Sequence, residues 1–191
     1  MEEILKIQQQ IKEIIQRTTD NAILLNIEVW KPIDGYDNYE VSTKGNVRNA
    51  TTGKILKPGK GSHGYYIVVL YKNSIAKSCT VHKLVAQTFI GNAESKPFVD
   101  HIDNDRLNNN VSNLRWVTYS ENNQNQSKNI RNTSGVKGIS YDKKRNKWDS
   151  RINVNGKIKF LGLFLNKDDA VKARQEASKK YYGEFRNKCE Q

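Results

Sequence analysis

Cysteine and long apolar runs are scarce in this chain. Its two cysteines, Cys79 and Cys189, stand far apart and form neither a zinc-type pair nor the disulfide framework of a small secreted protein. No apolar run is long enough to span a membrane, and the amino terminus lacks a signal-peptide profile. We therefore expect a soluble intracellular protein in a reducing compartment, without structural zinc and without a membrane partner.

Basic residues, by contrast, are in excess. The 191 residues include 32 Lys and Arg against 20 Asp and Glu, which gives a formal charge of +12 and a pI near 9.6. The net charge is −1 over residues 1–26, +5 over 27–90, 0 over 91–131 and +8 over 132–191. A neutral section between two basic ones suits DNA held by flanking modules. The alternative is a protein that is basic without an anionic partner.

Residues 99–122, VDHIDNDRLNNNVSNLRWVTYSEN, combine acid, imidazole and amide groups in a turn-rich segment. Asp100 and Asn122 offer the oxygen ligands that Mg²⁺ prefers, and the imidazole of His101 titrates near neutral pH. Neighbouring residues of a strand face opposite ways, so Asp100 and His101 share a cleft only if the strand ends there. The segment predicts a metal-dependent site that cuts a phosphodiester. The alternative is an ordinary hydrogen-bonded surface turn.

A helix start follows this segment. Thr118 and Glu121 have the spacing of a capping box, which predicts that Thr118 is the N-cap and that Asn122 lies in the first turn. A strand end and a helix start that face each other, with ligands from each, would form a clamp for one metal ion.

The same segment resembles the HNH homing endonucleases of phages and large DNA viruses, in the branch whose first histidine position is Asp. The resemblance rests on DHID, LNN, NLRWVT and EN, at residues 100–103, 107–109, 113–118 and 121–122. One departure is Asn104, where the family often has Gly. Asn also tolerates left-handed backbone, so we expect a strain of only about 1 kcal/mol there.

The resemblance implies a role for each of four residues. Asp100 and Asn122 would bind a divalent ion, Mg²⁺ or Mn²⁺, His101 would act as general base, and Asn113 would orient the histidine. It also implies a ββα-metal core, predicted here over residues 79–126, and an intracellular location in the cytoplasm, nucleus or nucleoid of a virus-infected cell.

Two features are predicted before this core, and a helix is predicted at its start. Residues 1–26 are predicted to form an amphipathic helix, whose apolar positions are Ile4, Leu5, Ile7, Ile11, Ile14 and Ile15. This helix either docks on the body of the protein or pairs with a partner helix, with self-association possible through residues 1–20. Residues 27–78 contain short strands and resemble a nuclease-associated modular motif that contacts DNA. A helix is predicted over residues 80–90, and its His82 is read as structural rather than catalytic.

In residues 27–78, lysines and arginines in or near turns are the candidates for phosphate contacts: Lys44, Arg48, Lys54, Lys57 and Lys60. Trp30 and Tyr39 are read as core residues, with base stacking as the alternative, because small sheets need large apolar side chains.

A linker is predicted over residues 127–133. Residues 134–188 resemble the Apetala-type DNA-binding domain, with strands over 136–141, 147–154 and 157–164 and a helix from about 168 to 182. Alternation places Lys147 and Arg151 on the face away from the helix. Asp149, on the same face, either weakens phosphate binding or accepts a hydrogen bond from cytosine. The candidate DNA contacts are Lys137, Tyr141, Arg145, Lys147, Arg151, Lys157 and Lys159.

The sequence as a whole predicts an α+β protein: a ββα-metal core flanked by a small β-rich module and by a three-stranded antiparallel sheet packed on one helix. The predicted function is sequence-specific, divalent-metal-dependent hydrolysis of double-stranded DNA, with no small-molecule substrate. The alternative is a catalytically inactive, sequence-specific DNA-binding regulator.

Overall fold

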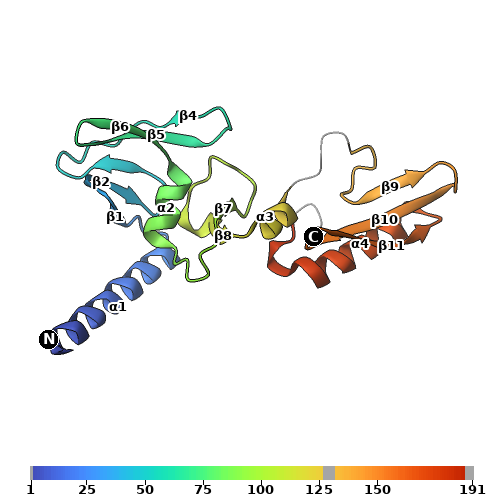
Figure 1. Cartoon of the computed structure of the whole chain (residues 1–191), viewed down its shortest axis with the longest axis horizontal. Coiled ribbons are helices and arrows are strands. Elements are labelled where there is room, and N and C mark those ends of the chain that lie inside the picture. Colours follow the sequence, from blue (N-terminus) through green and yellow to red (C-terminus); the bar gives the residue numbers. More distant parts are fainter. Residues whose placement is uncertain (1, 127–131, 188–191) are drawn as a thin grey trace. The chain divides into compact units, whose positions relative to one another are not determined.

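The structure is a computed structural model, and it describes residues 2–126 and 132–187. It is a mixed α+β structure, as predicted, with four α-helices and several small antiparallel sheets in the described part (Figure 1). The chain divides into two compact units. Unit 1 comprises Met1–Ser95 and Asp105–Trp116, and unit 2 comprises Lys96–Asn104 and Val117–Gln191. The predicted core over residues 79–126 therefore contributes to both units.

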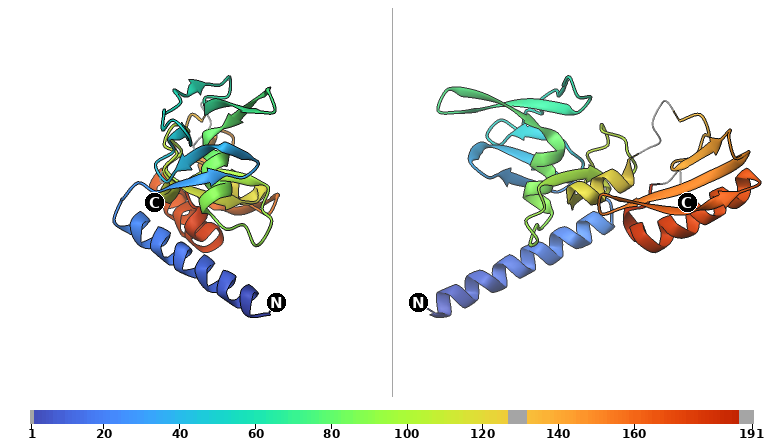
Figure 2. Two further views of the ribbon diagram at one scale, coloured as in Figure 1. Left: turned by 90° about the vertical axis from the view of Figure 1, so that its left-hand side faces the viewer. Right: turned by 45° about the vertical axis from the view of Figure 1, so that its right-hand side comes forward.

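Unit 1 begins with the predicted amphipathic helix, α1 (Glu2–Leu24), which Figure 2 shows as one long, continuous helix. Thr19, near its carboxyl end, is buried, whereas its apolar side chains nearer the amino end are exposed. The exposed fraction is 61% for Ile4, 51% for Ile7, 50% for Ile11 and 64% for Ile14. The helix thus leaves most of its apolar stripe uncovered in the monomer.

Two small antiparallel sheets form the body of unit 1. The first contains β1 (Trp30–Ile33), β2 (Tyr36–Ser42) and β3 (Val47–Asn49), and the second contains β4 (Gly59–Lys60), β5 (Tyr66–Lys72) and β6 (Ile75–Thr80). Helix α2 (Val81–Phe89) packs against β1, β2, β5 and β6. The residues buried between these elements include Val41, Val47, Val68, Leu70, Val81, Leu84, Val85, Ala86 and Phe89.

The later segment of unit 1 contains a short 3₁₀ helix, η1 (Val111–Asn113), which leads into β8 (Leu114–Val117). The Val111 N–H donates to the Thr43 carbonyl at 2.8 Å, and the indole of Trp116 donates to the Ile90 carbonyl at 3.0 Å. Gly45 has a φ of 82°, and a Cβ there would lie 2.7 Å from the Cβ of Asn109, so glycine is required at this close approach.

Unit 2 contains β7 (Phe98–His101), α3 (Tyr119–Asn125) and a carboxy-terminal layer of sheet and helix. The sheet has the order β11-β10-β9, formed by β9 (Ile139–Asp142), β10 (Lys147–Val154) and β11 (Lys157–Phe164). Helix α4 (Lys167–Tyr182) covers one face and is followed by the 3₁₀ helix η2 (Gly183–Phe185). Ile152, Ala177 and Tyr182 form the buried cluster between sheet and helix.

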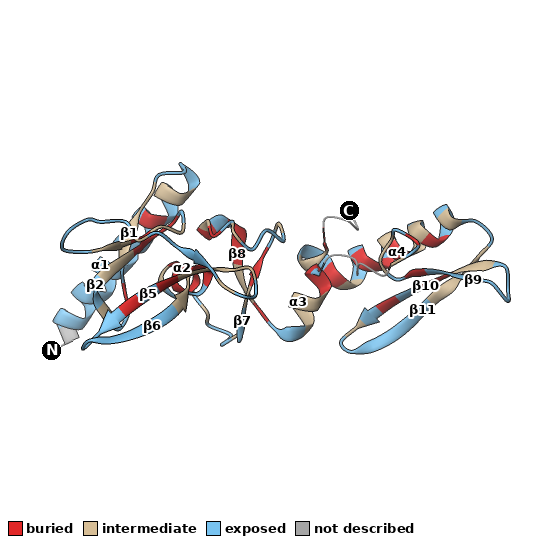
Figure 3. Ribbon diagram, turned by 90° about the horizontal axis from the view of Figure 1, so that it is seen from above, coloured by how far each residue is buried: buried red, intermediate tan, exposed pale blue. Residues whose placement is uncertain are grey.

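The strands and the helix of this layer lie where the sequence predicts them, apart from β9, which begins three residues later than expected. Figure 3 shows buried residues interspersed with less buried ones along β10 and α4, and exposed residues along most of α1 and at the end of β11 that follows the β10–β11 turn. Residues 127–131 of the predicted linker, and Cys189, lie outside the described residues. No helix in the described part is both long and apolar enough to cross a membrane.

Candidate functional site

Strand β7 ends at His101, as the argument for a shared cleft requires. Asp100 and His101 are both buried, with exposed fractions of 7% and 5%. The chain then turns through Asn104, whose φ of 65° is left-handed and whose N–H donates to the His101 carbonyl at 2.9 Å. The expected left-handed Asn104 is therefore confirmed. The imidazole, however, is less exposed than a solvent-reachable base would be.

The Asp100 carboxylate is held by Asn125, a residue that is not among the site residues predicted from the sequence. The Nδ2 of Asn125 lies 3.1 and 2.9 Å from the two carboxylate oxygens of Asp100 and 3.0 Å from the His101 carbonyl. Its Oδ1 accepts from Nδ2 of Asn104 at 3.3 Å. With an exposed fraction of 1%, Asn125 ties the end of β7 to the end of α3. We call Asp100, His101, Asn104 and Asn125 the Asp100 cluster.

Asn122 lies in the first turn of α3, as predicted, and its N–H donates to the Thr118 carbonyl at 3.0 Å. Residues three apart on a helix are neighbours on its surface, with Cβ atoms about 5–6 Å apart. Asn125 contacts Asp100, and Asn122 is the residue three positions before Asn125 on the same helix. Its side chain is half-buried and forms no hydrogen bond within the described part of the chain.

The start of α3 is fixed by the predicted capping box. The Glu121 N–H donates to Oγ1 of Thr118 at 3.3 Å, and the Thr118 N–H donates to Oε2 of Glu121 at 2.6 Å. The ammonium of Lys96 lies 3.1 Å from the other oxygen of Glu121. Burial alone would raise the pKa of Glu121, but the hydrogen bonds from the Thr118 backbone and from Lys96 outweigh it and lower the pKa.

The far end of α3 is also fixed within unit 2. The ammonium of Lys137 donates to the carbonyls of Asn123, Gln124 and Gln126 at 3.2, 3.2 and 3.0 Å. The side-chain amide of Asn187 donates to the backbone carbonyl of Asn125. Lys137, a predicted DNA contact, therefore already serves as the cation at the carboxyl end of a helix.

Asn113, predicted to orient His101, belongs to unit 1. It is buried in η1, and its Nδ2 donates to the Asn108 carbonyl at 2.8 Å. Its effect on the histidine stays a prediction. His82 is also buried in unit 1, where its ring lies 4.6 Å from that of Tyr65, an environment that suits a structural histidine.

The donor set fits a hard divalent cation rather than zinc. The Asp100 cluster and Asn122 offer one carboxylate, one imidazole and several amides, and Mg²⁺ takes few protein oxygens while keeping positions for water and phosphate. Across residues 2–126 and 132–187, no three His, Cys, Asp or Glu side chains gather as a metal-binding group.

The basic candidates in unit 1 are in two kinds of environment. Lys44, Lys54, Lys57 and Lys60 are exposed in or near turns. Arg48 is half-buried: its Nε lies 2.7 Å from Oε2 of Glu40, and its guanidinium lies 4.2 Å from the Trp30 ring centre. Arg48 therefore supports the first sheet in addition to any contact with DNA.

The carboxy-terminal candidates divide between the two faces of the sheet. The hydroxyl of Ser150 donates to the Ala170 carbonyl of α4, which places Ser150 and, by alternation, Ile152 on the helix face. Lys159 pairs with Ile152, and its ammonium lies 4.7 Å from the Tyr181 ring of α4. The structure therefore does not bring all the predicted contacts onto one face.

Register assigns the remaining candidates in the same way. Lys157 and Tyr141, which pair with Val154 and Trp148, also fall on the helix face. Arg145 lies in the turn between β9 and β10, with its Nη1 3.1 Å from Oδ2 of Asp142. We call the side of the sheet away from α4 the open face; it carries Lys147, Asp149, Arg151, Asn153, Ile158 and Phe160.

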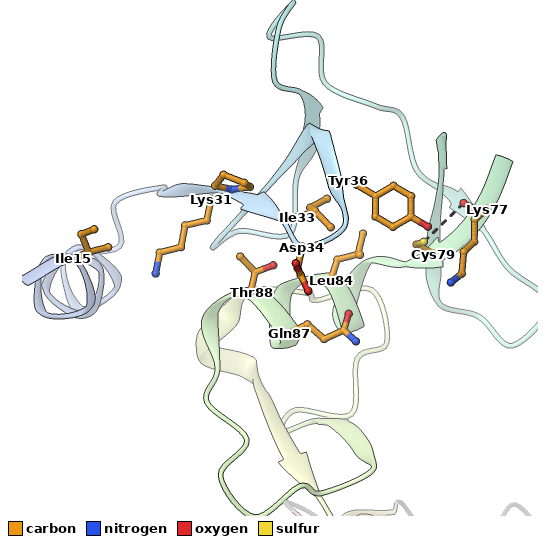
Figure 4. A pocket seen from close by; sticks show the side chains of 11 residues that line it. Ile15, Lys31, Ile33, Asp34, Tyr36, Lys77, Cys79, Leu84, Gln87 and Thr88 are labelled. Carbon is orange, nitrogen blue, oxygen red and sulfur yellow. Dashed lines mark hydrogen bonds between the residues drawn. The ribbon is translucent and has the colours of Figure 1, made fainter. Parts of the chain in front are cut away.

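Unit 1 contains a hollow of about 700 Å³ that involves none of the predicted catalytic or metal-binding residues. Figure 4 shows the side chains of Asp34, Tyr36, Lys77 and Cys79 around it. The Cys79 thiol donates a hydrogen bond to the Lys77 carbonyl, with a sulfur–oxygen distance of 3.8 Å. Burial and the neighbouring thiol raise the pKa of Tyr36. No local pattern in the sequence indicates this hollow, because its lining comes from helix and strand positions far apart in the chain.

Comparison with known proteins locates two families in the chain. Residues 28–71 match the NUMOD4 motif, and residues 79–124 match the HNH endonuclease family. Both ranges lie within the segments predicted from the sequence. Neither match extends beyond residue 124, so the Apetala-type character of residues 134–188 stays a prediction.

Two curated relatives and one solved structure are similar to this chain. The uncharacterized HNH endonuclease L245 of Acanthamoeba polyphaga mimivirus is 39% identical over 140 residues, 70% of this chain and 41% of L245. The DNA endonuclease I-HmuI of Bacillus phage SP01 is 42% identical over 98 residues, 51% of this chain and 56% of that protein. A solved structure concerned with DNA binding and cleavage by the HNH homing endonuclease I-HmuI is 30% identical, with a TM-score of 0.49, and the match covers 79% of this chain and 88% of that one.

The matched part of this chain thus spans about half the length of these curated relatives, or less. The two family matches are adjacent in the sequence, and the second contains Asp100, His101 and Asn122. This chain carries an HNH endonuclease segment at residues 79–124, seven residues after a NUMOD4 motif at residues 28–71.

Proposed function

We propose that the chain is a homing-type DNA endonuclease that hydrolyses phosphodiester bonds of double-stranded DNA at specific sequences with the aid of Mg²⁺ or Mn²⁺. The single observation that carries the proposal is the Asp100 cluster, because one buried amide fixes a carboxylate beside a histidine at the end of a strand. The HNH family match over the same residues supports it.

In this proposal, Asp100 and Asn122 hold the divalent ion, and Asn125 orients the Asp100 carboxylate. Once bound, the ion supplies charge stabilisation to the phosphate in the transition state. His101 accepts the proton of the attacking water, which is the role of a general base. Asn113 orients His101. Exposed lysines of unit 1 and the open face of unit 2 bind the flanking DNA.

Nicking of supercoiled plasmids that carry a randomised insert tests the proposal. We expect nicks with Mg²⁺ and none with a chelator. His101→Ala and Asn122→Ala should each lose nicking while DNA affinity, measured by fluorescence anisotropy, is retained. His63→Ala, which removes an exposed histidine outside the cluster, is the matched control and should cut normally.

Binding without nicks under any divalent ion would instead support the alternative, an inactive DNA-binding regulator. Full activity in both His101→Ala and Asn122→Ala would remove the assigned roles.

We also propose that α1 pairs with a second copy of the chain. Its stripe of isoleucines is half exposed or more, and Glu3 and Arg17 stand two heptads apart beside that stripe. An antiparallel pair would place isoleucine opposite isoleucine and Glu3 near Arg17 of the copy. Sedimentation equilibrium should show a dimer that Ile7→Lys abolishes and that Gln9→Lys, at an exposed polar position, leaves intact. A monomer at all concentrations would rule the pairing out.

A further inference from the structure

We propose that Asp149 is a positioning residue that holds Arg151 ready for a two-bond contact with guanine in the major groove of double-stranded DNA. The inference rests on the proposed DNA binding, and it concerns recognition rather than cleavage. It gives Asp149 a role different from the two that the sequence left open, which were weaker phosphate binding and a hydrogen bond from cytosine.

The two side chains form a bidentate pair on β10. Nε and Nη2 of Arg151 lie 2.8 and 2.7 Å from the two carboxylate oxygens of Asp149. The Asp149 side chain is 7% exposed, whereas the Arg151 side chain is 55% exposed. A fixed acid at the base of the pair thus aims a guanidinium toward solvent.

The pair uses one edge of the guanidinium and leaves another. A guanidinium has five N–H groups in a planar fork, and Asp149 takes the edge formed by Nε and Nη2. Within the described residues, Nη1 forms no hydrogen bond. The edge formed by Nη1 and the second hydrogen of Nη2 therefore points outward. That edge matches the O6 and N7 acceptors of guanine.

The neighbours of Arg151 on the open face suit base edges better than phosphates. Arg151 pairs across the sheet with Phe160, and Asn153 pairs with Ile158. Phe160 is 59% exposed and Ile158 is 69% exposed, although both are large apolar side chains. An apolar side chain gains nothing beside a phosphate, but it can contact the methyl group of thymine. We therefore expect the selected guanine to have a thymine beside it.

The net charge of the Asp149–Arg151 pair also favours contact with base edges over contact with phosphates. The hydrogen bonds and the negative charge of Asp149 raise the pKa of Arg151, so the arginine stays protonated, yet the pair as a whole is neutral. A neutral pair adds little to the salt-dependent attraction between protein and DNA backbone. The pair therefore contributes to the choice of base and not to general affinity.

Selection of bound duplexes from a random-sequence DNA library, in the presence of a chelator, tests this inference without any need for cleavage. The full-length protein should enrich a guanine at one position. Arg151→Lys and Asp149→Asn should each reduce that preference about tenfold, since a bidentate arginine contact gives discrimination of this order. Glu176→Gln, which removes an exposed acid of α4 outside the open face, is the control and should keep the preference.

Salt dependence gives a second readout that a purely structural role would not change. Asp149→Asn frees a cation, so its plot of log affinity against log salt should steepen by about one unit while affinity for nonspecific DNA rises. An unchanged guanine preference in Asp149→Asn or in Arg151→Lys would overturn the inference, as would a wild-type selection without guanine. If Asp149→Asn unfolds, as shown by circular dichroism, the exposed Arg151→Lys decides the question. A guanine preference without nicking would end the nuclease proposal and leave this one intact.

Discussion

The Asp100 cluster and the open face each hold one charged side chain in place, but they do so in opposite ways. In the cluster, the amide of Asn125 orients a buried carboxylate and adds no charge of its own. On the open face, a buried carboxylate orients an exposed guanidinium and cancels its charge. The first arrangement leaves the carboxylate with the negative charge that the proposed divalent cation would need. The second fixes the direction of the guanidinium but leaves the pair with no net charge. We infer that a metal-binding carboxylate is best oriented by a neutral group, whereas a base-contacting arginine can be oriented by an acid.

The largest expected effect tests whether the β11-β10-β9 sheet has one face packed on α4 and an open face that contacts DNA. Ile152 is buried against α4, so Ile152→Ala should lower the free energy of unfolding by about 2–5 kcal/mol. Phe160→Ala, on the open face, should change it by less than about 0.5 kcal/mol yet weaken DNA binding. Urea denaturation and anisotropy measure the two quantities. A comparable loss of stability in both variants would contradict the division.

The next effect concerns the amide of the Asp100 cluster. Asn125→Ala removes the donor that orients Asp100, and loss of such an outer support costs about 10–100-fold in metal affinity or activity. We expect plasmid nicking to fall by this factor while DNA affinity is retained. Gln126→Ala, at the adjacent exposed position, is the control. Normal nicking by Asn125→Ala would show that the amide does not position the carboxylate.

A smaller effect separates helix support from DNA contact at Lys137. Because its ammonium lies against three carbonyls at the end of α3, Lys137→Met should lower the free energy of unfolding by about 1 kcal/mol. Lys143→Met, at an exposed lysine of the β9–β10 turn, should not. If instead Lys137→Met leaves urea denaturation unchanged and weakens DNA binding, the lysine contacts DNA and does not support the helix.

The smallest effect is the pH dependence of the α3 cap. The pKa of Glu121 is lowered in the folded state, so its contribution is complete above the unfolded value near 4.5 and is lost as the pH falls through the folded value. The contribution should be about 1 kcal/mol or less, as for other partly exposed pairs. Glu121→Gln should show less acid destabilisation than wild type in thermal unfolding below pH 4.5. Identical acid profiles would mean that the pair with Lys96 does not stabilise the helix start.

Local patterns explain what could be predicted. The end of β7 at His101, the left-handed Asn104 and the N-cap at Thr118 each follow from residue types within a few positions of one another. The family match over residues 79–124 confirms the reading of that segment.

Contacts between separate segments could not be predicted. Asn125 looked like the polar end of a helix, because nothing near it in the sequence shows that its amide faces Asp100. Lys137 looked like a surface cation for the same reason. Lys159 is a predicted DNA contact, but its pairing with Ile152 on β10 places it on the helix face.

The sequence by itself determined the elements of this protein, the HNH segment and the excess of positive charge on either side of it, because propensity, turn chemistry and net charge are local or additive properties. The tertiary structure alone decided which amide holds Asp100, which face of the carboxy-terminal sheet is open, and that Asp149 is joined to Arg151. These depend on strand register and on the packing of distant segments, which bring side chains together in ways that no local pattern encodes.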